Sequence, residues 1–194
     1  MDTELLYREI MGIQNVELCK WLEEKTERLH LDRGEYLIRQ GQAQTVIPFL
    51  MKGVIRGFYL AEDGSEITDC LITQKGYPVV GGVDYTRPSP VYLDALTDCD
   101  LLTIPVGEVT DMLERNPEAM LFYNRILKEA FNQYWQTQNK MIRGTAMERY
   151  MWFLETYPGL IDQISNRYVA SFLGMTTVTL SRLRSELRKQ NEKE

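Results

Sequence analysis

The sequence predicts an α+β chain in which an antiparallel β-roll, or jelly roll, is followed by a long helix and then by shorter helices. Two observations predict this fold class. Short apolar runs alternate with turn residues at intervals of about ten residues between positions 30 and 105, which is typical of an antiparallel sandwich or barrel. Apolar residues recur at helical spacing before this region and again after Val106.

The first predicted elements are an N-terminal helix and the strands of the roll. Leucine and isoleucine recur at helical spacing over residues 3–28. The roll is expected to begin near His30, and Asp63-Gly64 predicts a hairpin turn inside it. Strands are expected at the apolar runs, which are Tyr36–Ile38, Val46–Met51, Val54–Leu60, Ile67–Ile72, Val91–Leu96 and Leu101–Ile104.

The region after the roll is predicted to be helical. A short helix is expected from Val106 to Asn116, and Pro117 suits the first turn of the next helix. No proline or glycine follows Pro117 until Gly144, so one long helix is expected over residues 117–143. Gly144 then predicts a break before an amphipathic helix over Met147–Tyr157.

The long predicted helix carries two apolar faces. One is a seam with heptad spacing, which favours pairing with a second helix. The other comprises Phe122, Ile126 and Ala130. We therefore expect packing on the chain's own roll and on a second copy of the chain, with a helix buried in its own domain as the alternative. The predicted dimer interface is Met120, Asn124, Leu127, Phe131, Tyr134, Gln138 and Met141.

Residues 165–187 match a helix-turn-helix pattern. Ser165 and Thr176 are suited to cap two helices, and Gly174 permits the left-handed turn between them. The inward positions fall on Val169, Ala170, Leu173, Leu180, Leu183 and Leu187. Ala170 must be small because the second helix crosses above it. An ordinary helical hairpin is the alternative.

The outer side of the second helix suits the major groove of DNA. Arg182 can donate two hydrogen bonds to guanine, and Val178 can contact a thymine methyl group. Hydroxyl and basic side chains around them can anchor phosphates. The candidate DNA-binding residues are Ser165, Arg167, Thr176, Thr177, Val178, Thr179, Ser181, Arg182, Arg184 and Arg188. For each of them, a solvated surface position is the alternative.

The net charge of −6 is unevenly distributed along the chain. Residues 1–141 carry a net charge of −8, whereas residues 142–194 carry +2. From Ser165 to Glu194 there are six basic and three acidic side chains, Lys193 among the basic ones. The acidic total therefore does not exclude a nucleic acid as partner.

Few side chains in the sequence suit a metal site or catalysis. The three cysteines, Cys19, Cys70 and Cys99, are far apart, and His30 is the only histidine. Their spacing fits neither a disulfide framework nor a metal site, and no nucleophile motif is present. We expect reduced thiols, a cytoplasmic protein without a membrane span, no metal, no cofactor and no enzymatic activity.

With this order of parts, the chain resembles the cyclic-AMP receptor protein/fumarate–nitrate regulator (Crp/Fnr) superfamily. Residues 31–41 resemble the opening of the family's cyclic-nucleotide-binding-like β-roll, and residues 49–56 resemble the next strand and turn. Asn116-Pro117 begins the segment that forms the family's dimerisation helix, and residues 165–187 resemble its DNA-reading head.

The resemblance implies a division into three parts and a set of partners. The parts are a sensor domain (1–116), a dimerisation helix (117–143) and a helix-turn-helix domain without an evident wing (144–194). The implied function is that of a homodimeric regulator of transcription that binds a palindromic operator in double-stranded DNA and contacts RNA polymerase. A small-molecule sensor that acts mainly through protein contacts is the alternative.

The chain departs from the family at its phosphate-binding cassette. Gly82 stands where nucleotide-binding members have a glutamate, and Ser89 stands where they have an arginine. Cyclic AMP is therefore not expected to be the effector, whose identity stays open. By analogy with the family, the candidate ligand-binding residues are Val80, Gly81, Gly82, Arg87, Ser89 and Tyr92.

Overall fold

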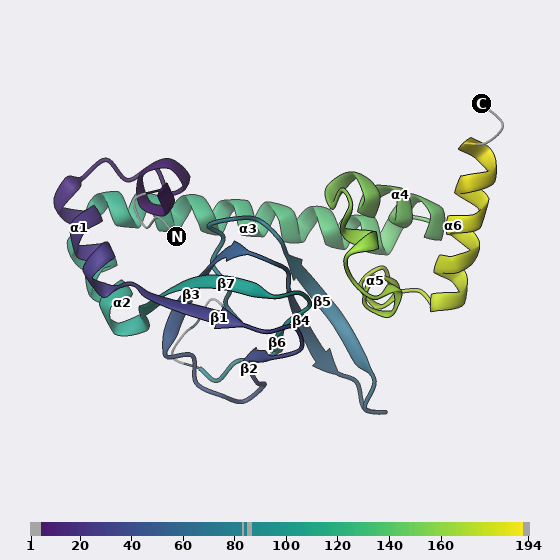
Figure 1. Ribbon diagram of the computed structural model, residues 1–194, viewed down its shortest axis with the longest axis horizontal. Coiled ribbons are helices and arrows are strands. Elements are labelled where there is room, and N and C mark those ends of the chain that lie inside the picture. The colour runs from purple at the N-terminus through teal and green to yellow at the C-terminus, as the bar shows by residue number, and fades with distance from the viewer. Residues whose placement is uncertain (1–4, 83, 85–86, 192–194) are drawn as a thin grey trace. The chain divides into compact units, whose positions relative to one another are not determined.

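The computed structural model describes residues 5–82, 84 and 87–191, and the chain forms two compact units (Figure 1). The first unit comprises residues 1–59 and 69–129, and the second comprises residues 60–68 and 130–194. One helix, α3 (Pro117–Arg143), contributes residues to both units. Positions 1–4, 83, 85–86 and 192–194 lie outside the described residues, and these include Lys193 of the predicted basic tail.

The N-terminal segment contains two short helices, as the helical spacing over residues 3–28 predicts, but the helices are separated by a break and a strand begins before residue 28. A π-helical segment, η1 (Leu5–Ile10), precedes α1 (Val16–Lys25), and the Asn15 side chain caps α1. Strand β1 (Glu27–Leu31) follows at once and pairs with β7 (Cys99–Pro105). Polar and apolar residues alternate in β1, and its pairing partner explains why this stretch is extended.

The strands form two antiparallel sheets. Their order is β1-β7-β3 in the three-stranded sheet and β2-β6-β4-β5 in the four-stranded sheet. The remaining strands are β2 (Tyr36–Ile38), β3 (Val46–Lys52), β4 (Ile55–Leu60), β5 (Glu66–Ile72) and β6 (Tyr92–Ala95). The strands expected from the apolar runs are confirmed, and the predicted turn at Asp63-Gly64 joins β4 to β5.

Two hydrophobic clusters stabilise the first unit. The cluster inside the roll draws on both sheets and includes Ile38, Leu50, Ile55, Val79, Leu93 and Leu101. The other cluster joins the N-terminal helices to β3, β7 and the start of α3, and includes Leu6, Leu18, Leu22, Phe49, Leu102 and Ala119. Burial of these side chains is the main favourable contribution to the free energy of folding.

A buried ion pair joins β4 to β6 in the four-stranded sheet. The Arg56 and Asp94 side chains are 2% and 9% exposed. Arg56 Nε donates to Asp94 Oδ1 over 2.9 Å, and its Nη2 donates to Oδ2 over 2.7 Å. The guanidinium lies 3.9 Å from the ring centroid of Phe58, which stacks on Tyr92. Because Arg56 and Asp94 are partners in the strand register, this pair fixes the register of β4 on β6.

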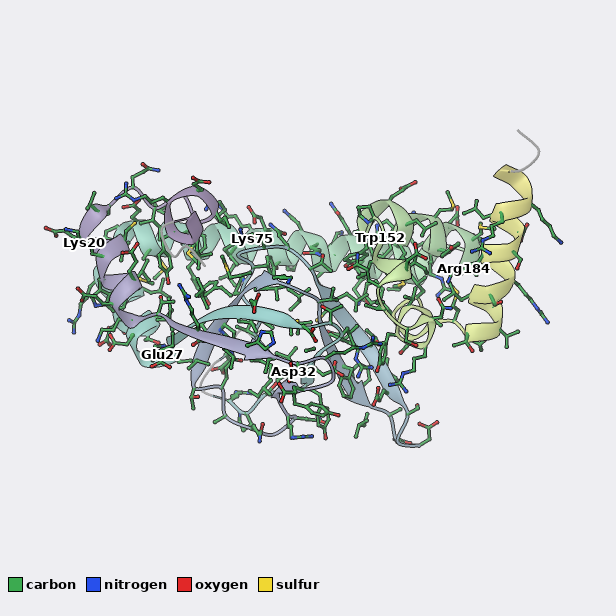
Figure 2. The ribbon with its side chains drawn as sticks, in the orientation of Figure 1. Lys20, Glu27, Asp32, Lys75, Trp152 and Arg184 are labelled. Atoms are coloured by element: carbon green, nitrogen blue, oxygen red, sulfur yellow. The ribbon has the colours of Figure 1, made fainter. Side chains whose placement is uncertain are left out.

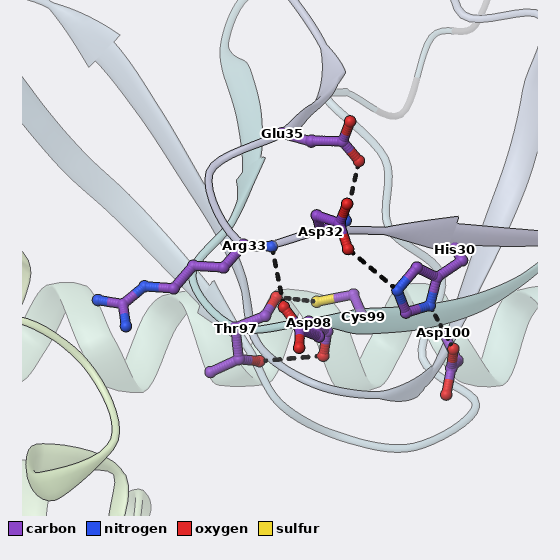
Figure 3. A network of polar contacts seen from close by, with 8 residues as sticks. All are labelled: His30, Asp32, Arg33, Glu35, Thr97, Asp98, Cys99 and Asp100. Carbon is purple, nitrogen blue, oxygen red and sulfur yellow. Dashed lines mark hydrogen bonds and ion pairs between the residues drawn. The ribbon is translucent and has the colours of Figure 1, made fainter.

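A polar network occupies the exposed edge of β1 and the turn before β7 (Figure 3). His30 Nδ1 lies 2.8 Å from Asp100 Oδ1, and His30 Nε2 lies 3.5 Å from Asp32 Oδ1. The hydrogen bond to Asp100 raises the pKa of His30 above its usual value. The backbone amide of Arg33 donates to Asp98, which ties the β1–β2 turn to the turn before β7. The histidine is therefore an exposed residue of a strand.

The three thiols lie in different parts of the chain. Cys19 and Cys99 are buried, and Cys70 on β5 is half-buried. Burial raises the pKa of Cys70 to about 12 and also raises the pKa values of Cys19 and Cys99. The thiols are accordingly protonated at neutral pH.

The β3–β4 turn depends on Gly53, which adopts a φ of +102°. A Cβ at this position would lie 2.5 Å from Cys99 Sγ and 2.6 Å from the carbonyl oxygen of Asp98. We predict that Gly53→Ala lowers the free energy of unfolding by about 3 kcal/mol, because strain from the positive φ adds to the clash. Equilibrium urea unfolding measures this change.

A matched control for this variant is Gly64→Ala in the β4–β5 turn. Gly64 has a φ of +79°, but a Cβ there would meet nothing within 4 Å. It should therefore cost only the strain of the positive φ, about 1 kcal/mol. Equal losses in the two variants would show that the contacts around Gly53 do not matter.

The helices after the roll follow the predicted order. They are α2 (Val106–Arg115), α3, α4 (Ala146–Thr156), the 3₁₀ turn η2 (Leu160–Asp162), α5 (Asn166–Phe172) and α6 (Thr177–Asn191). The long helix begins at Pro117 and ends before Gly144, as predicted. A capping box formed by Thr145 and Glu148 starts α4 directly afterwards.

Candidate functional site

Helices α5 and α6 form a packed pair joined by a tight turn. The Ser165 side chain accepts the amide hydrogen of Arg167, and that of Thr176 accepts the amide hydrogen of Thr179, so both predicted caps are confirmed. Gly174 between the helices has a φ of +60°. The predicted inward residues Val169, Ala170, Leu173 and Leu180 are buried, whereas Leu183 and Leu187 are half-buried.

Arg149 on α4 supports this turn and was not found from the sequence. Its Nη1 lies 3.2 Å from the point that a Cβ on Gly174 would occupy. Its Cγ lies 3.2 Å from the corresponding point at Gly144, where the helix breaks. One side chain therefore packs against both glycines. The Nε of Arg149 is buried and has no hydrogen-bond partner among the described residues.

The outer face of α6 brings most of the predicted DNA-binding residues together. Val178, Ser181, Arg182, Ser185 and Arg188 recur three or four positions apart along α6, and each of them is exposed. Val178 is 59% exposed, as expected for a side chain without a place in the core. The exposed set on or beside this face is Thr176, Thr177, Val178, Ser181, Arg182, Ser185 and Arg188.

The other predicted residues have partners within the chain. Arg184, labelled in Figure 2, donates from Nη1 to Asn166 Oδ1 over 2.9 Å. Its Nη2 lies 3.5 Å from Asp162 Oδ1, so its guanidinium ties α6 to the start of α5. Thr179 is half-buried, and its hydroxyl bonds with that of Thr176. Arg167 lies at the start of α5, and its guanidinium carbon is 4.5 Å from the ring centroid of Tyr168.

Helix α3 exposes a broad apolar face. Within the predicted seam, Phe131 and Tyr134 are 65% and 58% exposed, and Met120 and Asn124 are also exposed. Leu127, Gln138 and Met141 are half-buried, as are Phe122, Ile126 and Ala130 on the second predicted face.

The seam is wider than the sequence interpretation allowed. Leu121, Trp135 and Ile142 are 70%, 61% and 77% exposed and lie beside it. Trp135 stacks on Phe131 with a centroid separation of 6.4 Å. These three residues are separated by multiples of seven positions, so heptad spacing could have identified them.

The predicted ligand-binding residues are near one another in sequence but serve different roles. Ser89 is buried, and its hydroxyl donates to the carbonyl of Val91 over 2.7 Å. The Arg87 side chain is 82% exposed and pairs with Asp84. The Gly81 amide donates to Gln44 Oε1 over 3.2 Å, and Tyr92 stacks on Phe58. Val80 and Gly82 are half-buried.

A cavity of about 420 Å³ lies in the first unit at other residues. It is lined by Leu37, Ile38, Gln42, Ala43, Gln44, Thr45, Val46, Pro48, Val79 and Leu93. Within the described part of the chain, none of the predicted ligand-binding residues contributes to this lining. Most of the lining comes from the continuous stretch 37–48, and Val79 and Leu93 complete it from more distant parts of the chain, so no local spacing in the sequence signals the cavity.

No helix within residues 5–191 that the structure describes has the length and apolar character needed to cross a membrane. In the same part of the chain, no cluster of three or more histidine, cysteine or acidic side chains is placed to hold a metal ion.

Comparison with known proteins identifies the roll. The family model of the cyclic nucleotide-binding domain matches residues 28–116. The global nitrogen regulator of Synechocystis sp. is 26% identical over 173 residues, which cover 82% of this chain and 77% of that protein.

Solved structures with 15–16% identity share the fold. FixK2 from Bradyrhizobium japonicum is 16% identical, with a TM-score of 0.75 and coverage of 86% of each chain. A protein described as a Crp/Fnr-family transcriptional regulator from Eubacterium rectale is 15% identical, with a TM-score of 0.68 and coverage of 91% of this chain and 84% of the other.

Proposed function

Because residues 28–116 match the cyclic nucleotide-binding domain and the chain resembles a global nitrogen regulator over most of its length, we propose that it is a member of the Crp/Fnr superfamily and a homodimeric, sequence-specific DNA-binding regulator of transcription. The observation that carries the proposal is the exposed face of α6, where Val178, Ser181 and Arg182 lie together on the side away from the buried contact with α5. An exposed helix face of this kind fits the major groove, and its arginine suits guanine.

The proposal assigns a role to each of three parts of the chain. Residues 1–116 act as the sensor domain, residues 117–143 as the dimerisation helix, and residues 144–194 as a helix-turn-helix domain. Two copies present two α6 helices, so the operator is a palindrome whose half-sites lie about 34 Å apart. The protein acts in the cytoplasm, where RNA polymerase is a further contact.

Control by cyclic AMP is not part of the proposal. A buried cyclic phosphate needs a cation that pairs with it, because a buried charge without a partner is costly. Gly82 and Ser89 carry no charge, and the Ser89 hydroxyl already donates to Val91. Arg87 is exposed and pairs with Asp84. These contacts among the described residues support an effector other than cyclic AMP.

The proposal predicts that Arg182→Ala weakens binding to the selected operator. An operator is first selected from random duplexes with the wild-type protein, and affinities are then measured by fluorescence anisotropy. Loss of a bidentate contact with guanine should cost about 1–3 kcal/mol and relax sequence preference at that base pair. Arg115→Ala is the control, because it removes the same charge from an exposed site at the end of α2.

The outcomes separate the two candidate functions. Unchanged operator binding by Arg182→Ala would overturn the assignment of α6 as the reading helix. Failure of the wild-type protein to select any duplex would instead favour a small-molecule sensor that acts through protein contacts, which the cavity in the roll also supports.

A further inference from the structure

The cavity in the roll opens into the hydrophobic core. Ile38 of β2 and Leu93 of β6 come from the four-stranded sheet, and Pro48 comes from β3 in the other sheet. Val79 completes the floor, and its amide donates to the carbonyl of Pro48 over 2.7 Å. Ile38, Val79 and Leu93 all belong to the buried cluster inside the roll. The floor is therefore apolar.

The rim of the cavity is polar but uncharged. It is formed by residues 42–45, which link β2 to β3. Both ends of the Gln44 amide have partners, because its Oε1 accepts from Gly81 and its Nε2 donates to Val46. The Oε1 of Gln42 accepts from the Arg39 amide over 2.8 Å. Its Nε2 has no partner among the described residues and remains a donor at the rim.

The lining and the size of the cavity define the ligand. None of the described lining residues is acidic or basic, so an anion would leave water without gaining a charged partner. The volume of about 420 Å³ falls within the range of small-molecule sites. We propose that the cavity binds an uncharged small molecule that is apolar at the end facing Ile38, Val79 and Leu93 and carries a hydrogen-bond acceptor that meets Gln42 Nε2.

The rim also provides a path from the ligand to the helices. The carbonyl of Thr45 accepts the amide hydrogen of Val106 over 2.9 Å, and Val106 is the first residue of α2. A ligand that binds more tightly when residues 42–45 adopt the observed conformation also favours the observed start of α2. The ligand can shift this conformational equilibrium only by the difference between its binding free energies for the two conformations.

The experiment titrates the full-length protein with N-phenylnaphthylamine, a neutral apolar dye, in the absence of DNA. Ala43→Trp should fill the mouth of the cavity and weaken dye binding at least tenfold. Ala61→Trp is the matched control, since it makes the same exchange in the β4–β5 turn and should leave the affinity unchanged. Circular dichroism verifies that both variants are folded.

A second arm tests the absence of charge. Anilinonaphthalene sulfonate has the same aromatic frame with an added sulfonate group. Its affinity for the site that Ala43→Trp blocks should be at least tenfold lower than that of the neutral dye. Comparable binding of the anion at that site, displacement of the neutral dye by cyclic AMP, or unchanged dye binding by Ala43→Trp would each overturn the proposal. Operator binding is measured separately, so either proposal can fail alone.

Discussion

Asp94→Ala is expected to lower the free energy of unfolding by about 3–5 kcal/mol, because the Arg56 guanidinium stays buried after the Asp94 carboxylate that pairs with it is removed. Both hydrogen bonds of the bidentate pair are lost. The register of β4 on β6 also loses the side-chain contact that fixes it. Equilibrium urea unfolding, followed by circular dichroism at one protein concentration, measures the change.

A double variant separates the worth of the pair from the cost of breaking it. Arg56→Met with Asp94→Leu replaces both charges with apolar groups of similar volume, which is often neutral or stabilising. The double variant should therefore be clearly more stable than Asp94→Ala. If Asp94→Ala is as stable as the wild type, water reaches the ion pair and its loss does not change the free energy of unfolding. If the double variant is as unstable as the single one, the loss reflects altered packing.

Phe131→Glu combined with Trp135→Glu is expected to make the protein monomeric at micromolar concentration. The two rings stack on each other and lie at the centre of the exposed face of α3. In a symmetric dimer, four carboxylates would meet across the interface and lose hydration without a positive partner. Analytical ultracentrifugation measures the association state, with the wild type expected to be a dimer.

Loss of dimerisation in this double variant should also lower its affinity for the operator. Two linked reading helices gain about 10²–10⁴-fold over one through effective concentration, so a loss of at least 100-fold is expected. Gln133→Glu with Gln136→Glu is the control, because it adds the same charge on the opposite, exposed side of α3. If the variant with Phe131→Glu and Trp135→Glu remains dimeric, the dimer interface lies elsewhere on the chain.

The sequence was most informative where local chemistry decides local structure. Ser165, Gly174 and Thr176 determine the ends of α5 and α6 through capping and a positive φ, and these positions follow from residue type alone. The long helix was equally accessible, since Pro117 and Gly144 bound an uninterrupted stretch. The helical range predicted at the N-terminus extended too far because the alternation in β1 was not recognised as a strand, and the break inside it was missed because Asn15 was not recognised as a cap.

Features that depend on distant residues could not be predicted. Arg184 was expected to contact phosphate, yet its partners Asn166 and Asp162 precede it by 18 and 22 positions. The cavity is similar in this respect, because its floor joins β2, β3 and β6 with Val79. Its existence depends on how two sheets face each other, and no residue spacing in the sequence records that arrangement.

The protonated cysteines give the chain a set of natural reporters of local opening. A thiol that is buried and protonated reacts with an alkylating reagent only after the structure around it opens. Cys19 belongs to the cluster beneath the N-terminal helices and Cys99 to the interior of the roll, whereas Cys70 on β5 is only half-buried. The labelling rates of Cys19 and Cys99 therefore report the local opening of two regions separately, and no introduced probe is needed.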